Sequence, residues 1–271
     1  MMLLLISSLG ANTAAQETAL AEPLANVSYA QVIAQPYRDH NQQLTYGNRE
    51  FQFARGWLPT KAPVGLMIVV HGGCWLNQFD LDHTRALATE LATQGFATWL
   101  LEYRRVGDPG GGWPGSLQDV QAGINAVLQT APSLPAVLAG HSAGGHLALL
   151  AAQDTHVDGT GQIKGVIGLA AITDIARYAE GQNSCQQAAR AFMGGSPATL
   201  PQAYTAASVR KSPFNTHLLH GNLDTIVPAE QAEVHGLTNK IVNGAGHFDW
   251  IHTETAAFDT FMHTVTELLQ P

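Results

Sequence analysis

The sequence predicts an α/β protein in which helices cover both faces of a mostly parallel central sheet. Short continuous apolar runs recur along the chain, and stretches with apolar residues at helical spacing stand between them. Parallel neighbours need a crossover connection, usually a helix, so this alternation favours a parallel sheet. The 271 residues contain no internal repeat and no low-complexity linker, and we therefore expect a single domain over residues 16–271.

The first half of the predicted sheet lies between residues 64 and 153. Val64–Val70 (VGLMIVV) and Phe96–Tyr103 are apolar runs of the kind expected for strands buried on both faces. Asp82–Gln94, between them, has the apolar spacing of a helix. The next expected elements are a helix with Ser116 as its candidate cap, a strand and a further helix, over Ser116–Thr130, Ala136–Ala139 and Gly144–Gln153.

The second half continues the alternation after a looser segment. We expect strands over Ile163–Leu169, Thr216–His220 and Lys240–Val242, and helices over Glu230–His235 and Thr253–Leu269. Residues 174–212 interrupt the alternation of strands and helices and are predicted to form a small cap over the candidate nucleophile. In an open parallel sheet, ligands bind at the carboxyl ends of the strands, so the loops at that edge are the place to look for chemistry.

The candidate nucleophile is Ser142, in the G-x-S-x-G pattern of residues 140–144 (GHSAG). The pattern stands where a predicted strand ends and a predicted helix begins. Its glycines permit a sharp turn that exposes the serine side chain, and the helix directs its positive dipole end at negative charge forming nearby. The five-residue pattern alone is weak evidence, but the strand and the helix supply the context that it requires.

A serine nucleophile needs a base, and on this kind of scaffold the chain order is Ser, acid, His. His247 follows the last predicted strand in a glycine loop, and Asp224 leaves the strand before it, so both are expected at the same rim. Asp249 is the rival acid, but it stands too close to His247 in sequence to sit behind the ring easily. The other late histidines are expected to be packed, at an edge or solvated: His217, His220, His252 and His263.

The loop after the first buried strand is the candidate oxyanion hole. It reads HGGCW over residues 71–75, and its glycines allow backbone N–H groups to approach a developing negative charge. We expect donors from Gly73 and Cys74, together with the amide of Ala143 after the nucleophile. His71 is expected to form structural hydrogen bonds.

Taken in order, the motifs HGGCW, EYRRVGDPGGGWP, GHSAGGH, HGNLDTIVP and GAGHFDWI resemble those of the α/β-hydrolase superfamily. The HGG-x-W loop is similar to that of small bacterial esterases and of the kynurenine formamidase-like branch, while Cys74 in place of a third glycine separates the chain from the HGGG lipase-like branch. The resemblance covers roughly residues 56–269. It implies the α/β-hydrolase fold, with Ser142 as nucleophile, Asp224 as acid and His247 as base.

The expected function is that of a serine hydrolase which cleaves small carboxylic esters through an acyl-enzyme intermediate. Three alternatives stay open: an arylformamidase acting on N-formylkynurenine-like amides, a small peptidase, and an inactive binding module on the same scaffold. The substrate is expected to be a small ester or amide. No cofactor is implied, and no metal-ligand spacing is present. Aromatic residues near the rim loops are candidates for the substrate pocket: Trp75, Trp113, Phe192 and Phe248.

The composition and the N-terminal residues indicate which partners and which cellular location to expect. The net charge of −8 and the lack of a basic run argue against nucleic acid, and no apolar run reaches the length of about 18 residues that a membrane span needs. Residues 1–15 resemble an export signal, with an apolar core and small residues after it, although the usual positive start is absent. We expect a periplasmic or secreted protein, with a cytoplasmic one as the alternative. Cys74 and Cys185 are expected to be free thiols.

Overall fold

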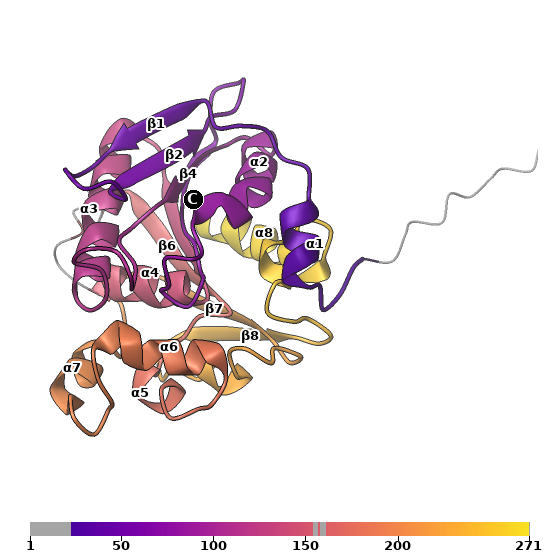
Figure 1. Cartoon of the computed structure of the whole chain (residues 1–271). Coiled ribbons are helices and arrows are strands. Elements are labelled where there is room, and N and C mark those ends of the chain that lie inside the picture. Colours follow the sequence, from indigo (N-terminus) through magenta and orange to yellow (C-terminus); the bar gives the residue numbers. More distant parts are fainter. Residues whose placement is uncertain (1–22, 154–156, 158–160, 271) are drawn as a thin grey trace, which may run out of the picture.

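The computed structural model describes residues 23–153, 157 and 161–270, and these residues form an eight-stranded sheet (Figure 1). The strand order is β1-β2-β4-β3-β5-β6-β7-β8. The β1–β2 and β2–β4 pairs are antiparallel, and all later pairs are parallel. The strands are β1 (Gln42–Thr45), β2 (Phe53–Trp57), β3 (Gly65–Val70), β4 (Phe96–Leu101), β5 (Ala136–His141), β6 (Ile163–Leu169), β7 (Thr216–Gly221) and β8 (Thr238–Val242). The expected export signal at residues 1–15 lies outside the described residues.

Helices pack on both faces of this sheet because successive side chains of each buried strand point to opposite sides. In β3, Leu66, Ile68 and Val70 pack in the cluster that contains α3 (Gly115–Thr130) and α4 (Ala143–Gln153). Met67 and Val69 pack in the second cluster, with α2 (Arg85–Thr93) and α8 (Ala256–Leu269). Figure 1 shows the same division into two helical layers. The predicted mostly parallel sheet with helices on both faces is confirmed.

Several predicted elements differ from the structure in detail. The helix expected over residues 82–94 begins as a 3-10 turn, η1 (Leu81–Thr84), because the Asp80 side chain accepts from the amide of Asp82 before α2 starts. The helix expected over residues 230–235 is only the 3-10 turn η2 (Ala229–Ala232). Ser116 does not cap α3: its hydroxyl donates to the carbonyl of Arg104 and accepts from Gly112 N, which ties the helix to the preceding loop.

The interrupted segment, residues 174–212, contains three short helices at one end of the sheet (Figure 1). They are α5 (Ile175–Tyr178), α6 (Ser184–Met193) and α7 (Pro201–Ala206). The sequence pattern did not predict α1 (Tyr29–Ala34), the antiparallel pair β1 and β2, or the 3-10 turn η3 (Asp249–Ile251).

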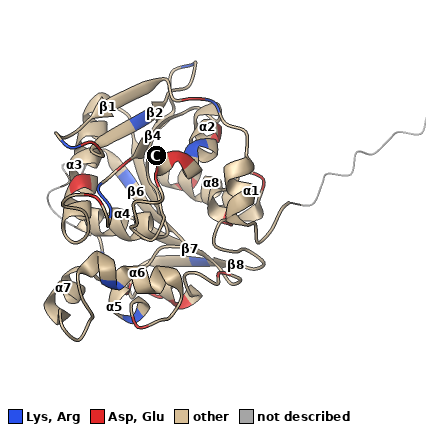
Figure 2. Ribbon diagram, in the orientation of Figure 1, with Lys and Arg blue, Asp and Glu red and all other residues tan. Residues whose placement is uncertain are grey.

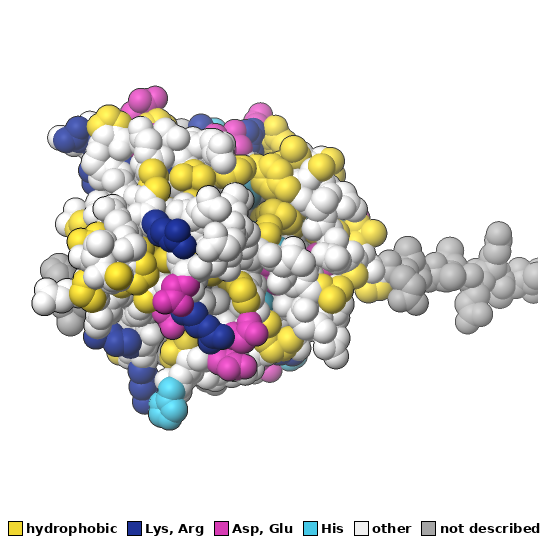
Figure 3. Space-filling view, turned by 60° about the horizontal axis from the view of Figure 1, so that its bottom comes forward, with side chains coloured by type: hydrophobic (Ala, Val, Ile, Leu, Met, Phe, Trp, Pro, Cys, Tyr) yellow, Lys and Arg dark blue, Asp and Glu magenta, His cyan; other side chains and the backbone are white. Residues whose placement is uncertain are grey.

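Charged residues are scattered over many elements of the described chain (Figure 2). On the face that carries the cap helices, acidic and basic side chains lie beside one another instead of forming a patch of one sign (Figure 3). Within the described residues, no helix combines the length and the apolar character that a membrane crossing requires.

Two buried histidines link the stability of this fold to pH. Burial lowers the pKa of His146 to about 4, against an ordinary value of 6.5. Burial, followed by the proximity of His71, lowers the pKa of His83 to about 4 as well. Both rings are therefore neutral in the folded protein at neutral pH, whereas they ionise near 6.5 in the unfolded chain.

We predict that the free energy of unfolding falls as the pH drops from about 6.5 to about 4, because the unfolded state binds protons first in that window. Urea denaturation at several pH values measures this dependence. A His146→Gln variant, in which an amide can still donate to the carbonyl of Ala207, is expected to show a shallower dependence. An unfolding free energy that is constant over the whole window would contradict the prediction.

Candidate active site

Ser142 lies in a strained turn between β5 and α4. Its φ angle is 54°, in the left-handed region that non-glycine residues rarely adopt. The turn depends on the glycines at either side of it. A Cβ atom at Gly140 would collide with the carbonyl oxygen of Gly144, and one at Gly144 would collide with the carbonyl of His71. The turn therefore brings the end of β5, the start of α4 and the loop after β3 close together around the serine.

The His247 ring is held by a hydrogen bond from its Nδ1 to Oδ2 of Asp224, at 2.7 Å. An ionised carboxylate only accepts, so Nδ1 carries the proton and Nε2 is left as an acceptor. The other carboxylate oxygen of Asp224 accepts from the amides of Ile226 and Val227 at 2.9 and 2.8 Å. Nε2 of His220 lies 3.4 Å from Oδ2 and 2.9 Å from the carbonyl of Val227. These contacts fix the position of the carboxylate.

The Asp224 carboxylate is fully buried, and burial by itself would raise its pKa. The charge of His247 and the hydrogen bonds from His220, His247 and the Val227 amide outweigh burial and hold the pKa of Asp224 well below its ordinary value. The group is therefore ionised across the physiological range. A fixed negative charge behind the imidazole stabilises its protonated form.

His141, next to Ser142, is a buried neighbour of the His247 ring. Its Nε2 lies 2.9 Å from the carbonyl oxygen of His247, and the two ring centroids are 4.7 Å apart. A carbonyl only accepts, so Nε2 of His141 donates and holds the backbone of residue 247. Burial, with the charge of His247 as a second cause, lowers the pKa of His141 well below its ordinary value. The neutral ring adds no positive charge that would oppose protonation of His247.

The loop after β3, the candidate oxyanion hole, has left-handed backbone at three successive residues. Gly73, Cys74 and Trp75 all have positive φ angles, of 106°, 53° and 59°. Gly73 and Cys74 line the same cavity as Ser142. A Cβ atom at position 73 would collide with the side chain of Phe79. Ala143 is buried as the first residue of α4, where helix amides have no partner within the helix.

The buried side chains of His71 and Glu102 support this loop. The ring nitrogen Nε2 of His71 lies 2.9 Å from Oε1 of Glu102, and both side chains are buried. The ring also stacks on Tyr103 with centroids 4.6 Å apart, and the tyrosine hydroxyl donates to the carbonyl of His71 at 3.0 Å. Burial would raise the pKa of Glu102, but His71 and Arg105 lower it below its ordinary value. His71 therefore has the structural role expected for it.

Cys74 and Cys185 form a disulfide, and the prediction of two free thiols is wrong. Their Cα atoms lie 5.1 Å apart although 111 positions separate them in sequence. The bond joins the candidate oxyanion loop to α6 of the cap. Sequence spacing carried no signal for it, because only the folded positions of the loop and the helix bring the two residues together.

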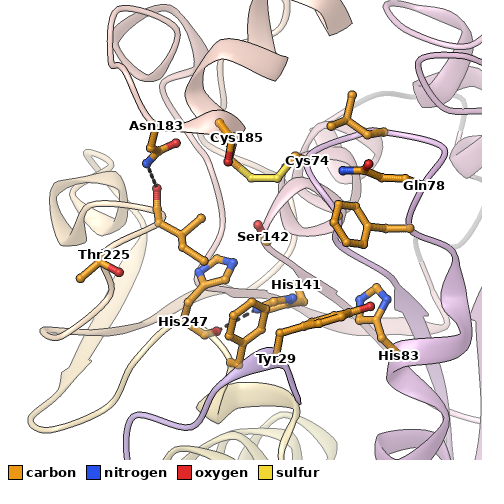
Figure 4. Close-up of a pocket in the computed structure, with 16 residues that line it drawn as sticks. Tyr29, Cys74, Gln78, His83, His141, Ser142, Asn183, Cys185, Thr225 and His247 are labelled. Atoms are coloured by element: carbon orange, nitrogen blue, oxygen red, sulfur yellow. Dashed lines mark hydrogen bonds between the residues drawn. A yellow bond between two sulfur atoms is a disulfide. The ribbon is translucent and has the colours of Figure 1, made fainter. Parts of the chain in front are cut away.

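A mostly apolar cavity of about 340 Å³ opens at Ser142 and His247 (Figure 4). The disulfide borders it on one side and Tyr29 on the opposite side, with Ser142 between them. The Asn183 side chain donates to the carbonyl of Ile226 at 3.0 Å, which attaches the predicted cap segment to the loop that carries Asp224. The cavity is lined by Tyr29, Gly73, Cys74, Leu76, Gln78, Phe79, His83, His141, Ser142, Asn183, Ser184, Cys185, Thr225, Ile226, His247 and Phe248.

Of the four aromatic residues expected in the pocket, the structure places one at the cavity and three away from it. Phe248 lines the cavity, but Trp75, Trp113 and Phe192 do not. Trp75 and Phe192 are fully buried and stack on each other with centroids 4.8 Å apart, and Trp113 meets the edge of Phe192. Trp75 and Phe192 belong to the core cluster that contains α3 and α4, and Trp113 packs against it.

Sequence reasoning missed Tyr29, Phe79, His83 and His141 as lining residues. Tyr29 follows Ser28, which forms a capping box with Gln31 at the start of α1. That S-x-x-Q spacing was a readable signal for a helix start.

The other candidate acid and the other late histidines lie in structural positions. Asp249, the rival acid, accepts from the backbone amides of Asn26 and Val27. His252 is buried and His217 is partly buried, while His263 is exposed and pairs with Glu267 at 3.1 Å. Among the described residues, no three His, Cys, Asp or Glu side chains gather as a metal site.

Comparison with known proteins gives one family match and many similar folds. The BD-FAE family model matches residues 58–239, more than half of the chain. No curated protein matches the chain in sequence. Similar solved structures include esterase B from Lactobacillus Rhamnosis (19% identity, 89% of each chain covered, TM-score 0.66). A truncated carbohydrate esterase from gut microbiota is similar over 85% of this chain and 97% of its own (21% identity, TM-score 0.66).

A hormone-sensitive lipase from a metagenome library is also similar (18% identity, 89% of each chain covered, TM-score 0.67). These similarities confirm the α/β-hydrolase fold that the sequence motifs implied.

We predict that removing the disulfide by the paired substitutions Cys74→Ser and Cys185→Ser lowers the free energy of unfolding by roughly 2–5 kcal/mol, because a long closed loop restricts the unfolded chain. Chemical denaturation without reductant measures the change. Gln187→Ser, at an exposed position of α6, is the matched control and should be near wild type. Equal stability of the paired variant and the wild type would contradict the prediction.

Proposed function

The chain belongs to the BD-FAE family and has the α/β-hydrolase fold, and we propose that it hydrolyses carboxylic esters of small substrates through an acyl-enzyme intermediate on Ser142. The observation that carries the proposal is the shared cavity. Ser142, His247 and the Gly73–Cys74 turn all line it, and His247 is oriented by a hydrogen bond to a buried, ionised Asp224. This is the arrangement that nucleophilic acyl transfer needs.

In the proposed mechanism, Ser142 Oγ attacks the carbonyl carbon of the ester while Nε2 of His247 takes the hydroxyl proton. The amides of Gly73, Cys74 and Ala143 stabilise the oxyanion that forms. The tetrahedral intermediate collapses, the C–O bond to the alcohol breaks, and His247 returns its proton to the leaving oxygen. Water then attacks the acyl-enzyme by the same steps and releases the carboxylic acid.

The similar solved structures support esters as the substrate class. They are described as an esterase, a carbohydrate esterase and a hormone-sensitive lipase. The apolar lining of the cavity suits the uncharged groups on either side of an ester. No contact in the described residues favours a formamide over an ester. The inactive binding module has no support either, since the candidate nucleophile Ser142, base His247 and acid Asp224 are all present.

We also propose an exported location. The disulfide between Cys74 and Cys185 supports it, because such bonds persist in oxidising compartments and are rare in the cytosol. This agrees with the export-like character of residues 1–15 in the sequence.

We predict that purified protein hydrolyses p-nitrophenyl acetate and p-nitrophenyl octanoate faster than N-formylkynurenine, and that Ser142→Ala lowers kcat/KM on the esters by at least about a thousandfold, because the nucleophile is lost. Steady-state rates on the three compounds measure this. Ser196→Ala, in the cap and outside the cavity, is the matched control and should keep wild-type rates.

Faster turnover of N-formylkynurenine than of either ester would reassign the protein as an arylformamidase. Ester hydrolysis that survives Ser142→Ala would remove Ser142 from the mechanism. Absence of any activity on the three compounds would revive the peptidase and the binding-module interpretations.

A further inference from the structure

The segment before the first strand, residues 24–35, forms an arm along the loop that follows His247. At its start, the amide of Leu24 donates to the carbonyl of Glu254 at 3.1 Å. At its end, the Gln35 side chain accepts from the amide of Thr253 at 2.8 Å and donates to the carbonyl of Ile251 at 3.3 Å. Both ends of the arm are therefore attached to the same loop, which also carries the candidate base.

Asp249 holds the arm near its start. Its two carboxylate oxygens accept from the backbone amides of Asn26 and Val27, each at 2.7 Å, and the residue is only 1% exposed. Hydrogen bonds to a buried carboxylate are among the stronger ones in proteins. Asp249 stands two positions after His247, so the arm and the base are fixed to one short stretch of chain.

The arm positions the first residue of α1. Val27 and Val32 are buried in the core cluster of this face, and Ser28 caps the helix that begins at Tyr29. The cap and both apolar anchors fix the backbone from which the tyrosine side chain leaves. Figure 4 shows the Tyr29 ring at the edge of the cavity.

The Tyr29 ring is part of an aromatic wall next to the base. Its centroid lies 5.6 Å from that of Phe248 and 5.9 Å from that of Phe79. Phe248 in turn lies 5.0 Å from the His247 ring. Tyr29 is the one residue of the arm among the described residues that line the cavity. Burial, and then the charge of Asp80, raise the pKa of Tyr29 above its ordinary value, so the ring stays uncharged also at mildly alkaline pH.

The side of the substrate that meets this wall follows from the chemistry. His247 must give its proton to the leaving oxygen, so the alcohol group of the ester departs beside the His247 ring. The wall begins there with Phe248 and continues with Tyr29. An aromatic face is suited to contact a flat or bulky apolar group.

We propose that Tyr29 is a specificity-determining residue that contacts the alcohol part of the ester, and that Asp249 is a positioning residue that holds the arm on which Tyr29 stands. The inference rests on the proposed ester hydrolysis at Ser142. It assigns a substrate-binding role to an N-terminal segment that lies outside the matched family region, residues 58–239.

The test compares ethyl acetate with benzyl acetate, which share the acetyl group and differ in the alcohol. Tyr29→Ala is expected to lower the ratio of kcat/KM for benzyl acetate to that for ethyl acetate by about fivefold or more, because one aromatic contact is lost. Tyr29→Phe keeps the ring and should restore the wild-type ratio. Asp249→Asn should change the ratio in the same direction as Tyr29→Ala, with the larger effect on KM. Ile33→Ala is the control, on the exposed side of α1 and outside the cavity.

An unchanged ratio in Tyr29→Ala, while Ser142-dependent hydrolysis continues, would overturn this inference and leave the proposed function intact. A Tyr29→Ala variant that altered instead the preference between p-nitrophenyl acetate and p-nitrophenyl octanoate would also overturn it, since that result would place the ring against the acyl group. A wild-type protein without Ser142-dependent hydrolysis would overturn both the inference and the proposed function.

Discussion

The 2.7 Å hydrogen bond between Asp224 and His247 depends on two neighbouring strands ending together, and the rest of the site is arranged around it. Asp224 follows β7 and His247 follows β8, which pair in parallel, so the two loops leave the same edge of the sheet. The bond fixes the tautomer of the imidazole and leaves its Nε2 free as an acceptor. The charge of His247 and the donors around the buried carboxylate outweigh burial and hold the pKa of Asp224 below its ordinary value.

Three further segments are attached to this edge by different physical means. Glycine contacts hold the Ser142 turn against the loop after β3, and no side chain fits between them. A disulfide joins that loop to the cap helix α6. The carboxylate of Asp249 holds the N-terminal arm through two backbone amides. The cavity is thus bounded by segments that are distant in sequence and are held by close backbone packing, a disulfide and hydrogen bonds.

The parts that the sequence predicted are those in which local pattern and chemistry coincide. Apolar runs identified β3 and β4 because both strands are buried on each face, and the GHSAG turn could be identified because only glycine permits its close contacts. The disulfide and the place of Tyr29 depend on contacts across the fold, which no spacing encodes. Trp75 and Phe192 were expected in the pocket because both are aromatic, but whether a ring lines a cavity or fills a core is decided by packing.

Covalent trapping of the nucleophile tests the central claim most directly. The protein is incubated with a fluorophosphonate, digested, and mapped by mass spectrometry. We predict one stoichiometric adduct on the peptide that contains Ser142, which disappears in Ser142→Ala and forms much more slowly in His247→Gln, because the base is lost. A protein that stays unlabelled, or carries the adduct on another serine, would contradict the assignment of Ser142, His247 and Asp224 as the catalytic residues.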